Sequence, residues 1–453
     1  MNAPIVWILA PILTGGLLLV LRRFQRLVWV AGTGIALLLA LAAAIVEFDT
    51  VFEIGPFSIE IQSAFQVLGR QFILADQDRQ ALVLVFLLAG LGFLLAPLAE
   101  PGSLLIPLGL IVSSLVIAAL SVDPFLYAAL FIEMIVLISV PLLVAPGTNP
   151  GKGAVRFLSY QTLGVPFILF SGRMLAGSEG SPGDFELVLR AAVLLGVGFA
   201  FFLAVFPFHS WLPMVFEETH PYVAAFVSIF ILIAASLFGI ELFNRFVWLR
   251  NSQNFHLVLR IGGLIMLLIG GAWAAFSAHL GRAIGFALMT FTGIVLLTFS
   301  LGFELNIEYY FPLVRSSALA VLIWSVCLRI VAEGRRGMGM VDLRGAGRAS
   351  PIAAAGLVLA ALTLAGYPIL ASYPQIARLL GGLSSQGVVA AAAAAIGLSG
   401  IAVHGLRGLG SLASLDGDDR TEESAPGRGV RRPAGQQVLL GGAIALMLLI
   451  GML

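Results

Sequence analysis

The chain has 453 residues, of which 60% are hydrophobic and 11% are charged, and its formal net charge is +1. Soluble domains carry close to a quarter charged residues, so this composition predicts an integral membrane protein. The small net charge argues against nucleic-acid binding, and a single cysteine, Cys327, cannot form a disulfide framework or a thiolate metal site.

Fourteen apolar runs are each long enough to cross a hydrocarbon core, which takes about 20 residues. Backbone groups find no water in lipid, so each run is expected to be an α-helix. The chain is therefore predicted to be an all-α polytopic membrane protein with about 14 transmembrane helices, in the runs 4–21, 27–46, 80–97, 103–121, 124–145, 153–175, 187–206, 222–243, 256–276, 281–302, 309–332, 352–373, 387–406 and 436–453.

Basic residues between the runs predict the orientation. If the N-terminus lies outside, the inside loops collect 16 of the 25 basic residues. This favours both termini on the extracytoplasmic side of a cell (inner) membrane, although the loop at 241–260 has the opposite bias. No charged region precedes the first run, so it is expected to be a retained helix and not a secretory signal.

Two polar stretches divide the chain. The segment at 47–80 includes the alternating residues 57–61, which predict a short strand or a surface helix outside the membrane. Residues 407–435 predict a flexible cytoplasmic loop. The expected units are 1–100 (three helices and an extracytoplasmic loop), 101–245 and 255–406 (five helices each), 407–435 (the loop) and 436–453 (a C-terminal helix).

Two runs are interrupted at matching places. Pro207 ends or breaks the seventh run, and Gly366 with Pro368 interrupts the twelfth. Each is the fourth member of a five-helix set, runs 4–8 and 9–13, and paired interruptions of this kind predict two inverted five-helix repeats. A proline frees backbone carbonyls that can line a polar path, and Pro213 adds a second helix breaker after Pro207.

Glu133 lies within the fifth run, between Pro124 and Pro141. An ionisable residue at membrane depth is costly and is a functional hypothesis. The alternative is a protonated glutamate that hydrogen-bonds to a neighbouring helix.

The segment 206–225 concentrates the remaining candidates for a proton path. These are His209, Glu217, Glu218 and His220, and His279 joins them from a later loop. Glu217 and His220 have a spacing used in carboxylate-bridged metal sites, but no second copy of the pair exists, so no metal is expected. His209 also has a simpler reading, as an interfacial residue that satisfies the backbone freed around Pro207.

The histidines all fall near predicted helix ends, which argues against haem, and there is no phosphate loop, dinucleotide fingerprint or catalytic triad. We therefore expect no cofactor and no catalytic chemistry in this chain.

The segment from His209 to Pro213, followed by Glu218 and Pro221 to Phe226, carries a family resemblance. It resembles the junction of helices 7 and 8 in the antiporter-like, proton-conducting membrane subunits of respiratory complex I, of Mrp-type cation/proton antiporters and of membrane-bound hydrogenases. Residues 341–351 and 364–368 resemble the approach to the broken helix 12 of that family, and residues 280–282 with Gly293 are similar to its helix 10.

The resemblance implies a relay of buried ionisable groups, and Glu133 matches the family's helix 5 glutamate. The family's helix 7 lysine, however, falls on Phe202, its helix 8 lysine or histidine near Ile233, and its helix 12 lysine or glutamate on Ile376, give or take a residue, and none of these can take a proton. Lys152, in a loop, is the only lysine of the chain, so no shift of the alignment restores them. Arginine is a poor substitute because its pKa is too high for it to release a proton.

Three functions remain open. The favoured one is a non-redox, antiporter-like subunit of a complex I-like or hydrogenase-like proton-translocating assembly, degenerate in pumping and partly structural, with other membrane subunits as its partners. The second is a proton or cation path that uses Glu133 and water in place of lysines. The third is an unrelated polytopic transporter.

Overall fold

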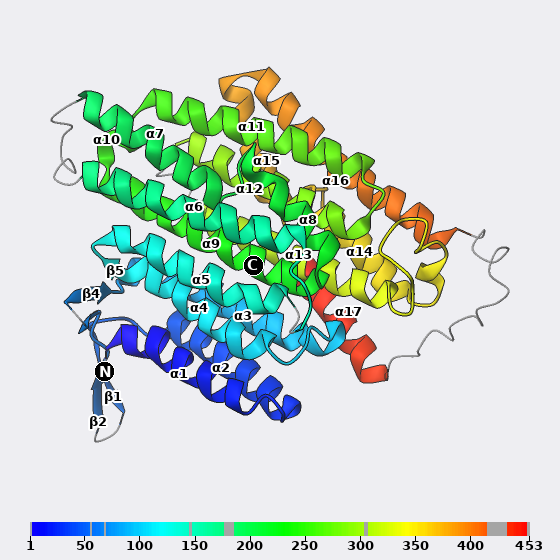
Figure 1. The fold of residues 1–453 in the computed structure, drawn as a ribbon, viewed down its shortest axis with the longest axis horizontal. Coiled ribbons are helices and arrows are strands. Elements are labelled where there is room, and N and C mark those ends of the chain that lie inside the picture. Colours follow the sequence, from blue (N-terminus) through cyan, green and yellow to red (C-terminus); the bar gives the residue numbers. More distant parts are fainter. Residues whose placement is uncertain are drawn as a thin grey trace.

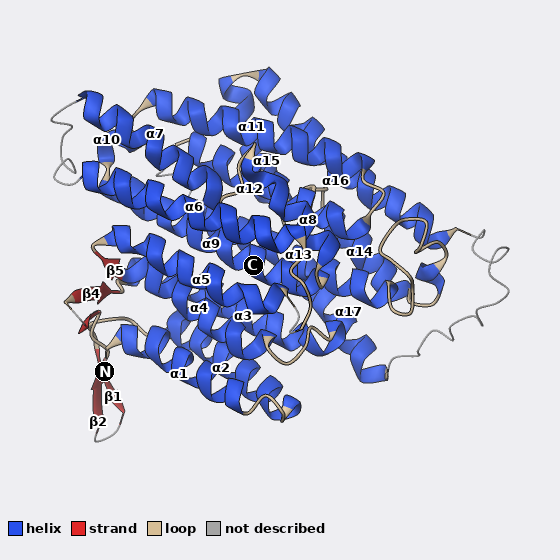
Figure 2. Ribbon diagram, in the orientation of Figure 1, coloured by secondary structure: helices blue, strands red, loops and turns tan. Residues whose placement is uncertain are grey.

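The computed structural model describes residues 2–54, 57–67, 69–144, 147–175, 185–302, 307–414 and 433–450. Within them the fold is a bundle of α-helices with five short strands gathered at one end, which we call the strand end (Figures 1 and 2). The segment 332–350 lies at the opposite end of the bundle, which we call the loop end (Figure 1).

The N-terminal part consists of three helices and two hairpins. A π-helical turn (Ile5–Leu9) leads into α1 (Ala10–Val20), and then come α2 (Gln25–Ile45), the antiparallel pair β1 (Val51–Ile54) and β2 (Phe57–Glu60), the pair β3 (Ala64–Val67) and β4 (Arg70–Ile73), and α3 (Arg79–Ala99). The sequence predicted a strand or a surface helix at 57–61, and the strand is correct.

The middle of the chain contains α4 (Leu105–Ser121), β5 (Val122–Asp123), α5 (Ala128–Leu143), α6 (Lys152–Leu175), α7 (Phe185–Phe202), α8 (Trp211–Glu218), α9 (Pro221–Arg245) and α10 (Val247–Arg250). β5 pairs with β4 and completes a three-stranded sheet. The remaining elements are α11 (Gln253–Phe276), α12 (Leu280–Ser300), α13 (Ile307–Val331), α14 (Pro351–Leu364), α15 (Tyr373–Gln386), α16 (Val388–Ala413) and α17 (Ala434–Leu449).

Many of these helices have the length and composition of membrane spans. Among the described residues, eight helices are long and apolar enough to cross a bilayer, and four shorter helices are also apolar. The long ones are Gln25–Ile45, Asp76–Ala99, Phe125–Leu143, Pro221–Arg245, Gln253–Phe276, Leu280–Ser300, Tyr309–Val331 and Val388–Ala413. The chain is therefore a multi-pass membrane protein.

Burial divides the helices into an interior and a periphery. The apolar stretch of α12 is completely buried and that of α9 is 94% buried, whereas only 33% is buried in α2 and in α11. Glycines let some helices touch directly: a Cβ placed on Gly271 of α11 would lie 1.9 Å from the carbonyl oxygen of Gly397 in α16. Small residues at helix contacts are typical of packing in lipid.

Each predicted run contains an α-helix, and three short helices were not predicted. These are α8, α10 and α15, which are too short or too polar to form apolar runs of about 20 residues. The predicted start of the polar loop at 407 is wrong, because α16 continues to Ala413 and its Ser411 hydroxyl bonds to the Met340 carbonyl. Residues 415–432 of that loop lie outside the described residues.

Candidate functional site

The break between α7 and α8 is built by a helix-ending turn. The N–H of Ala204 donates to the carbonyl of Phe201 (3.2 Å) and that of Val205 to the carbonyl of Ala200 (2.8 Å), while Ala204 has a positive φ of 51°. This is the Schellman pattern, in which a left-handed residue closes a helix. Pro207 follows and cannot donate a helical hydrogen bond, so the chain passes through a short 3₁₀ turn before α8 begins.

The end of α14 repeats this arrangement. Gly366 has a φ of 69° and its N–H donates to the carbonyl of Thr363 (3.0 Å), while the N–H of Tyr367 donates to the carbonyl of Leu362 (3.0 Å). Pro368 comes next, and α15 begins only at Tyr373. Two helices whose last residues are Phe202 and Leu364 therefore end in the same hydrogen-bond pattern.

Pro213 occupies a different position from the other predicted helix breakers. It is the third residue of α8, whereas Pro207, Gly366 and Pro368 lie between helices. The first turn of a helix has no carbonyl four residues earlier for its N–H groups, so a proline is tolerated there.

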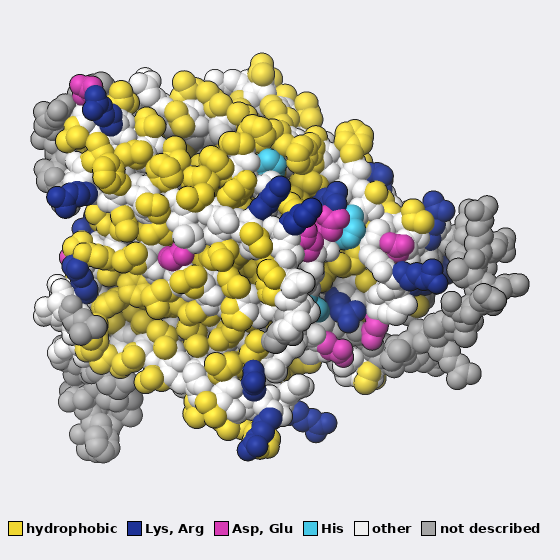
Figure 3. All heavy atoms as spheres, viewed as in Figure 1, with side chains coloured by type: hydrophobic (Ala, Val, Ile, Leu, Met, Phe, Trp, Pro, Cys, Tyr) yellow, Lys and Arg dark blue, Asp and Glu magenta, His cyan; other side chains and the backbone are white. Residues whose placement is uncertain are grey.

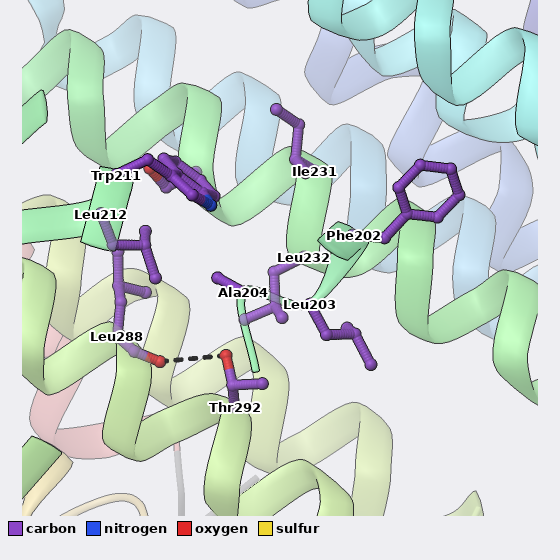
Figure 4. Close-up of a pocket in the computed structure, with 10 residues that line it drawn as sticks. Phe202, Leu203, Ala204, Trp211, Leu212, Ile231, Leu232, Leu288 and Thr292 are labelled. Carbon is purple, nitrogen blue, oxygen red and sulfur yellow. Dashed lines mark hydrogen bonds between the residues drawn. The ribbon is translucent and has the colours of Figure 1, made fainter. Parts of the chain in front are cut away.

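A small cavity of about 10 Å³ lies beside the break in α7 (Figure 4). It has room for about one water molecule. The hydroxyl of Thr292 donates to the carbonyl of Leu288 (3.2 Å), so that group is already used. None of the described residues that line the cavity has an ionisable side chain. The lining consists of Phe202, Leu203, Ala204, Trp211, Leu212, Ser228, Ile231, Leu232, Leu288 and Thr292.

Gln161 of α6 contacts the last two carbonyls of α7 at the break. Its side-chain nitrogen lies 3.3 Å from the carbonyl oxygen of Phe201 and 3.4 Å from that of Phe202, and the side chain is fully buried. Sequence reasoning missed this residue. The available signal was a single amide within the apolar α6 run, and a buried amide needs hydrogen-bond partners.

The positions that match the family's lysines are apolar and buried. Phe202 and Ile233 are each 1% exposed, and Ile376 is 2% exposed. Phe202 closes α7 at the break, and its ring packs on Gly164 of α6. Ile376 of α15 packs in the same way against Gly366 at the second break.

Glu133 lies at the seam between α5 and α6 and does not line the cavity. The hydroxyl of Thr162 donates to Glu133 Oε1 (2.8 Å), while Oε2 is buried without a hydrogen-bond partner in the described structure. Exposed apolar side chains, including Leu130 and Leu163, surround the seam. Thr162 and Gln161 are adjacent in α6, so one turn of that helix contacts both the carboxyl group and the break.

Glu217 and His279 lie at the loop end, where each has a structural contact. Arg282 of α12 holds the Glu217 carboxylate of α8 in a two-point ion pair, with Nε 2.9 Å from Oε2. His279 accepts a hydrogen bond from the Arg282 N–H at Nδ1 (3.1 Å) and so caps α12. Burial lowers the pKa of His279, and the nearby Glu217 carboxylate opposes this shift.

Glu218 and His220 hold other helix ends. The Gly153 N–H in the first turn of α6 donates to Glu218 Oε2 (2.7 Å), so a carboxylate sits at the positive end of that helix. His220 Nε2 lies 3.0 Å from the carbonyl oxygen of Ala99 at the end of α3. These contacts give both residues a role in tying helices together.

Acidification is expected to destabilise the protein through His220. Burial, with Arg329 nearby as a second cause, lowers its pKa from 6.5 to about 4. Between these values the unfolded chain binds a proton that the folded chain does not, so the stabilisation is complete above pH 6.5 and is lost as the pH falls towards 4. The free energy of unfolding falls by about 3 kcal/mol over this range.

Unfolding in detergent measured from pH 7.5 to 4.5 should show a weaker pH dependence for His220→Gln than for the wild type. His256→Gln serves as the control, and equal pH dependence in all three proteins would contradict the assignment.

His209 is buried beside the break without a hydrogen bond from either ring nitrogen to the described residues. Its ring stacks on Phe206 and meets Trp273 of α11 edge-on, with both centroid distances 5.5 Å. The six predicted path residues thus do not meet in one place: Glu217, Glu218, His220 and His279 lie at the loop end, Glu133 lies at the seam of α5, and His209 lies in the 3₁₀ turn after the first break. Among the described residues, no group of three or more His, Cys, Asp or Glu side chains is placed to hold a metal ion.

His404 occupies an unexpected position. Its predicted place near a helix end is wrong, because α16 extends nine residues beyond it. The imidazole is fully buried, and its ring centre lies 6.0 Å from that of Trp324 in α13.

Comparisons with known proteins agree with this fold. Residues 123–402 match the family model described as NADH:quinone oxidoreductase/Mrp antiporter, TM. The NADH-quinone oxidoreductase subunit N of Cytophaga hutchinsonii is 22% identical over 255 residues, which are 53% of this chain and 55% of that protein. The chain thus spans about half the length of the curated relatives it matches.

Two solved structures share the fold over nearly the whole chain. One is a chain of the membrane-bound sulfane sulfur reductase, an archaeal respiratory membrane complex, with a TM-score of 0.80, 16% identity, and coverage of 99% of this chain and 94% of that one. The other is a chain of respiratory complex I from Thermus thermophilus with bound NADH, with a TM-score of 0.75, 20% identity, and coverage of 99% and 95%.

The interpretation as an unrelated polytopic transporter is wrong, because the family model covers most of the chain, including both helix breaks. The resemblance at residues 209–226 is confirmed by the same match. The chain belongs to the NADH:quinone oxidoreductase/Mrp antiporter transmembrane family.

Proposed function

We propose that this chain is an antiporter-like membrane subunit of a complex I-like or hydrogenase-like proton-translocating assembly, degenerate in its own pumping and partly structural. The observation that carries the proposal is the chemistry at the lysine positions. Phe202, Ile233 and Ile376 are buried and cannot take a proton. The cavity beside the first break is too small for a chain of waters.

The architecture proposed for this role is 14 crossings with two inverted five-helix repeats, at 101–245 and 255–406. Matching neighbours support it: α6 packs on α7 as α13 packs on α14, and α4 packs on α9 as α11 packs on α16. The shared turn that ends α7 and α14 also supports it. Residues 1–100 supply three further helices, the polar segment between Ala413 and Ala434 a cytoplasmic loop and α17 the last helix.

The proposed orientation places both termini and the strand end outside the cell (inner) membrane. On the face shown in Figure 3, Lys and Arg side chains gather mostly towards the loop end. Arg282, Arg335 and Arg348 are among the basic residues in the segments at that end. This distribution supports a cytoplasmic loop end through the positive-inside rule.

The seam around Glu133 supports a membrane partner. A half-buried carboxyl group there is surrounded by exposed apolar side chains such as Met134 (45%) and Leu163 (48%). Polar groups facing lipid are costly, whereas a neighbouring membrane subunit can supply hydrogen-bond partners. The face over α5 and α6 is accordingly our proposed subunit contact.

Mild-detergent purification of the full chain tests the assembly. We expect it to co-purify with other antiporter-like subunits or with quinone-reducing or hydrogenase subunits. Leu163→Arg at the seam should release them, whereas Leu38→Arg, on the exposed side of α2, should not. Recovery of the wild type as a single chain would contradict the proposal, and retention of the partners by Leu163→Arg would move the contact to another face.

A second function, a proton or cation path through Glu133 and water, is favoured by one observation. Glu133 Oε2 is buried without a partner among the described residues, Thr162 is adjacent to Gln161 in α6, and Gln161 reaches the carbonyls of the break. In this reading water would connect the carboxyl group to the break, and Glu133→Gln would abolish proton movement.

A further inference from the structure

A second cavity opens at the strand end of α15 and contains an arginine that forms no ion pair with the described residues. It measures about 250 Å³. Its walls are the C-terminal end of α12, the first turns of α13, and one side of α15. Arg378 is the only charged side chain among the described residues that line it. The guanidinium carbon lies 4.6 Å from the centre of the Tyr309 ring, and no described carboxylate forms an ion pair with it.

This arrangement gives the cavity a positive potential. An aromatic ring orients a guanidinium without neutralising its charge. No carboxylate is among the described residues of the lining, so within this part of the chain the charge is available to an anion, and the planar guanidinium can donate two parallel hydrogen bonds to a phosphate. Gln386 and Tyr309 also line the cavity and carry further donor groups, whereas the Ser385 hydroxyl already donates to the Gly382 carbonyl (2.8 Å).

The cavity opens among helix ends at the strand end of the bundle. Leu301 caps the C-terminal end of α12, and Tyr309 is the third residue of α13. Gln386 ends α15 and is followed at once by the turn into α16. These helix ends place one side of the cavity at the strand end of the bundle, where membrane-crossing helices meet the interface between headgroups and hydrocarbon. Gln375 and Arg378, near the start of α15, extend the cavity from there towards the second helix break.

The surroundings fit a molecule with an apolar part as well as an anionic group. Leu313 and Leu379 form apolar parts of the lining. Beside it, Val388 and Val389 at the start of α16 are 75% and 83% exposed. Acyl chains would cover these valines while a headgroup entered the cavity, which a free phosphate ion would not do.

We propose that this cavity binds the phosphodiester headgroup of a membrane phospholipid, with Arg378 as its cationic contact. The cavity is not lined by Glu133, Phe202, Ile233 or Ile376, so its test does not depend on whether the chain moves protons, although Gln375 is adjacent to Ile376 at the second break. A lipid bound there would fix α15, the outward half of the second broken helix, against α12 and α13.

Native mass spectrometry of the full chain in mild detergent, titrated with phosphatidylglycerol, tests the site. Arg378→Gln should weaken the first bound lipid roughly tenfold, the value of one charge-assisted contact. Arg173→Gln is the matched control, because Arg173 is an exposed arginine near the end of α6 that does not line this cavity. Arg378→Lys, which keeps the charge but loses the planar fork, should fall between the wild type and Arg378→Gln.

A competition with inorganic phosphate separates the two possible sources of the ligand. We expect excess phosphate to leave the first lipid bound and to give no thermal stabilisation, whereas phosphatidylglycerol raises the melting temperature of the wild type and not of Arg378→Gln. Displacement of the lipid by phosphate would overturn the lipid assignment in favour of a free anion. Equal lipid binding by the wild type and Arg378→Gln, or an equal loss in Arg173→Gln, would overturn the site.

Discussion

Gly271→Ala is expected to destabilise the bundle by more than about 3 kcal/mol, because it separates α11 from α16. The added Cβ would lie 1.9 Å from the carbonyl oxygen of Gly397 and 2.6 Å from its carbonyl carbon. Both atoms belong to a backbone, so no rotamer change relieves the contact and the helices have to move apart. Unfolding in detergent, followed by circular dichroism or a thiol-reactive dye at Cys327, measures the loss.

Gly262→Ala provides a control on the same helix. A Cβ at that position meets nothing within 4 Å. Alanine favours a helix over glycine by about 1 kcal/mol in water, so this variant should be as stable as the wild type or slightly more stable. A Gly271→Ala protein with unchanged stability would mean that α11 and α16 do not approach as closely as the structure places them.

The helices could be predicted because burial in lipid leaves only one way to satisfy backbone groups. The two breaks could also be predicted, from Pro207 and from Gly366 with Pro368. The half-helix α15 could not, since its segment mixes Arg378 and Gln375 with leucines and does not form a long apolar run. Its conformation depends on packing against α16 and α13, and these tertiary contacts cannot be inferred from the local sequence.

The chemistry of the site was less predictable than the fold. Glu217 and Arg282 are 65 residues apart, and only the packing of α8 on α12 brings them together. Gln161 was missed because its function, contacting the last two carbonyls of α7, appears only when α6 and α7 are in contact. The missing lysines could be recognised from sequence because that inference needs residue identity and not geometry.

Phe202→Lys is expected to cost stability without creating a proton path. The variant loses a ring that packs on Gly164 and buries an amine in a cavity of about 10 Å³ with no carboxylate among its described lining residues. A buried, unpaired amine and the lost aromatic contacts together cost about 3–5 kcal/mol. Ile233 and Ile376 remain apolar further along, so a single lysine has no group to pass a proton to. Proton uptake by vesicles containing a pH-sensitive dye should therefore stay at the level of protein-free vesicles for the wild type and for this variant.

Phe202→Leu separates the effect of the charge from that of the lost ring. It should cost about 1 kcal/mol and leave the vesicles equally tight. Glu133→Gln completes the set, because it removes the acid without changing the size of the side chain. Proton uptake by the wild type that Glu133→Gln abolishes would establish the water-dependent path and refute degenerate pumping. Proton uptake gained only by Phe202→Lys would show instead that residue 202 alone closes an otherwise intact route. In that case the apolar side chains at 233 and 376 would be no barrier to protons.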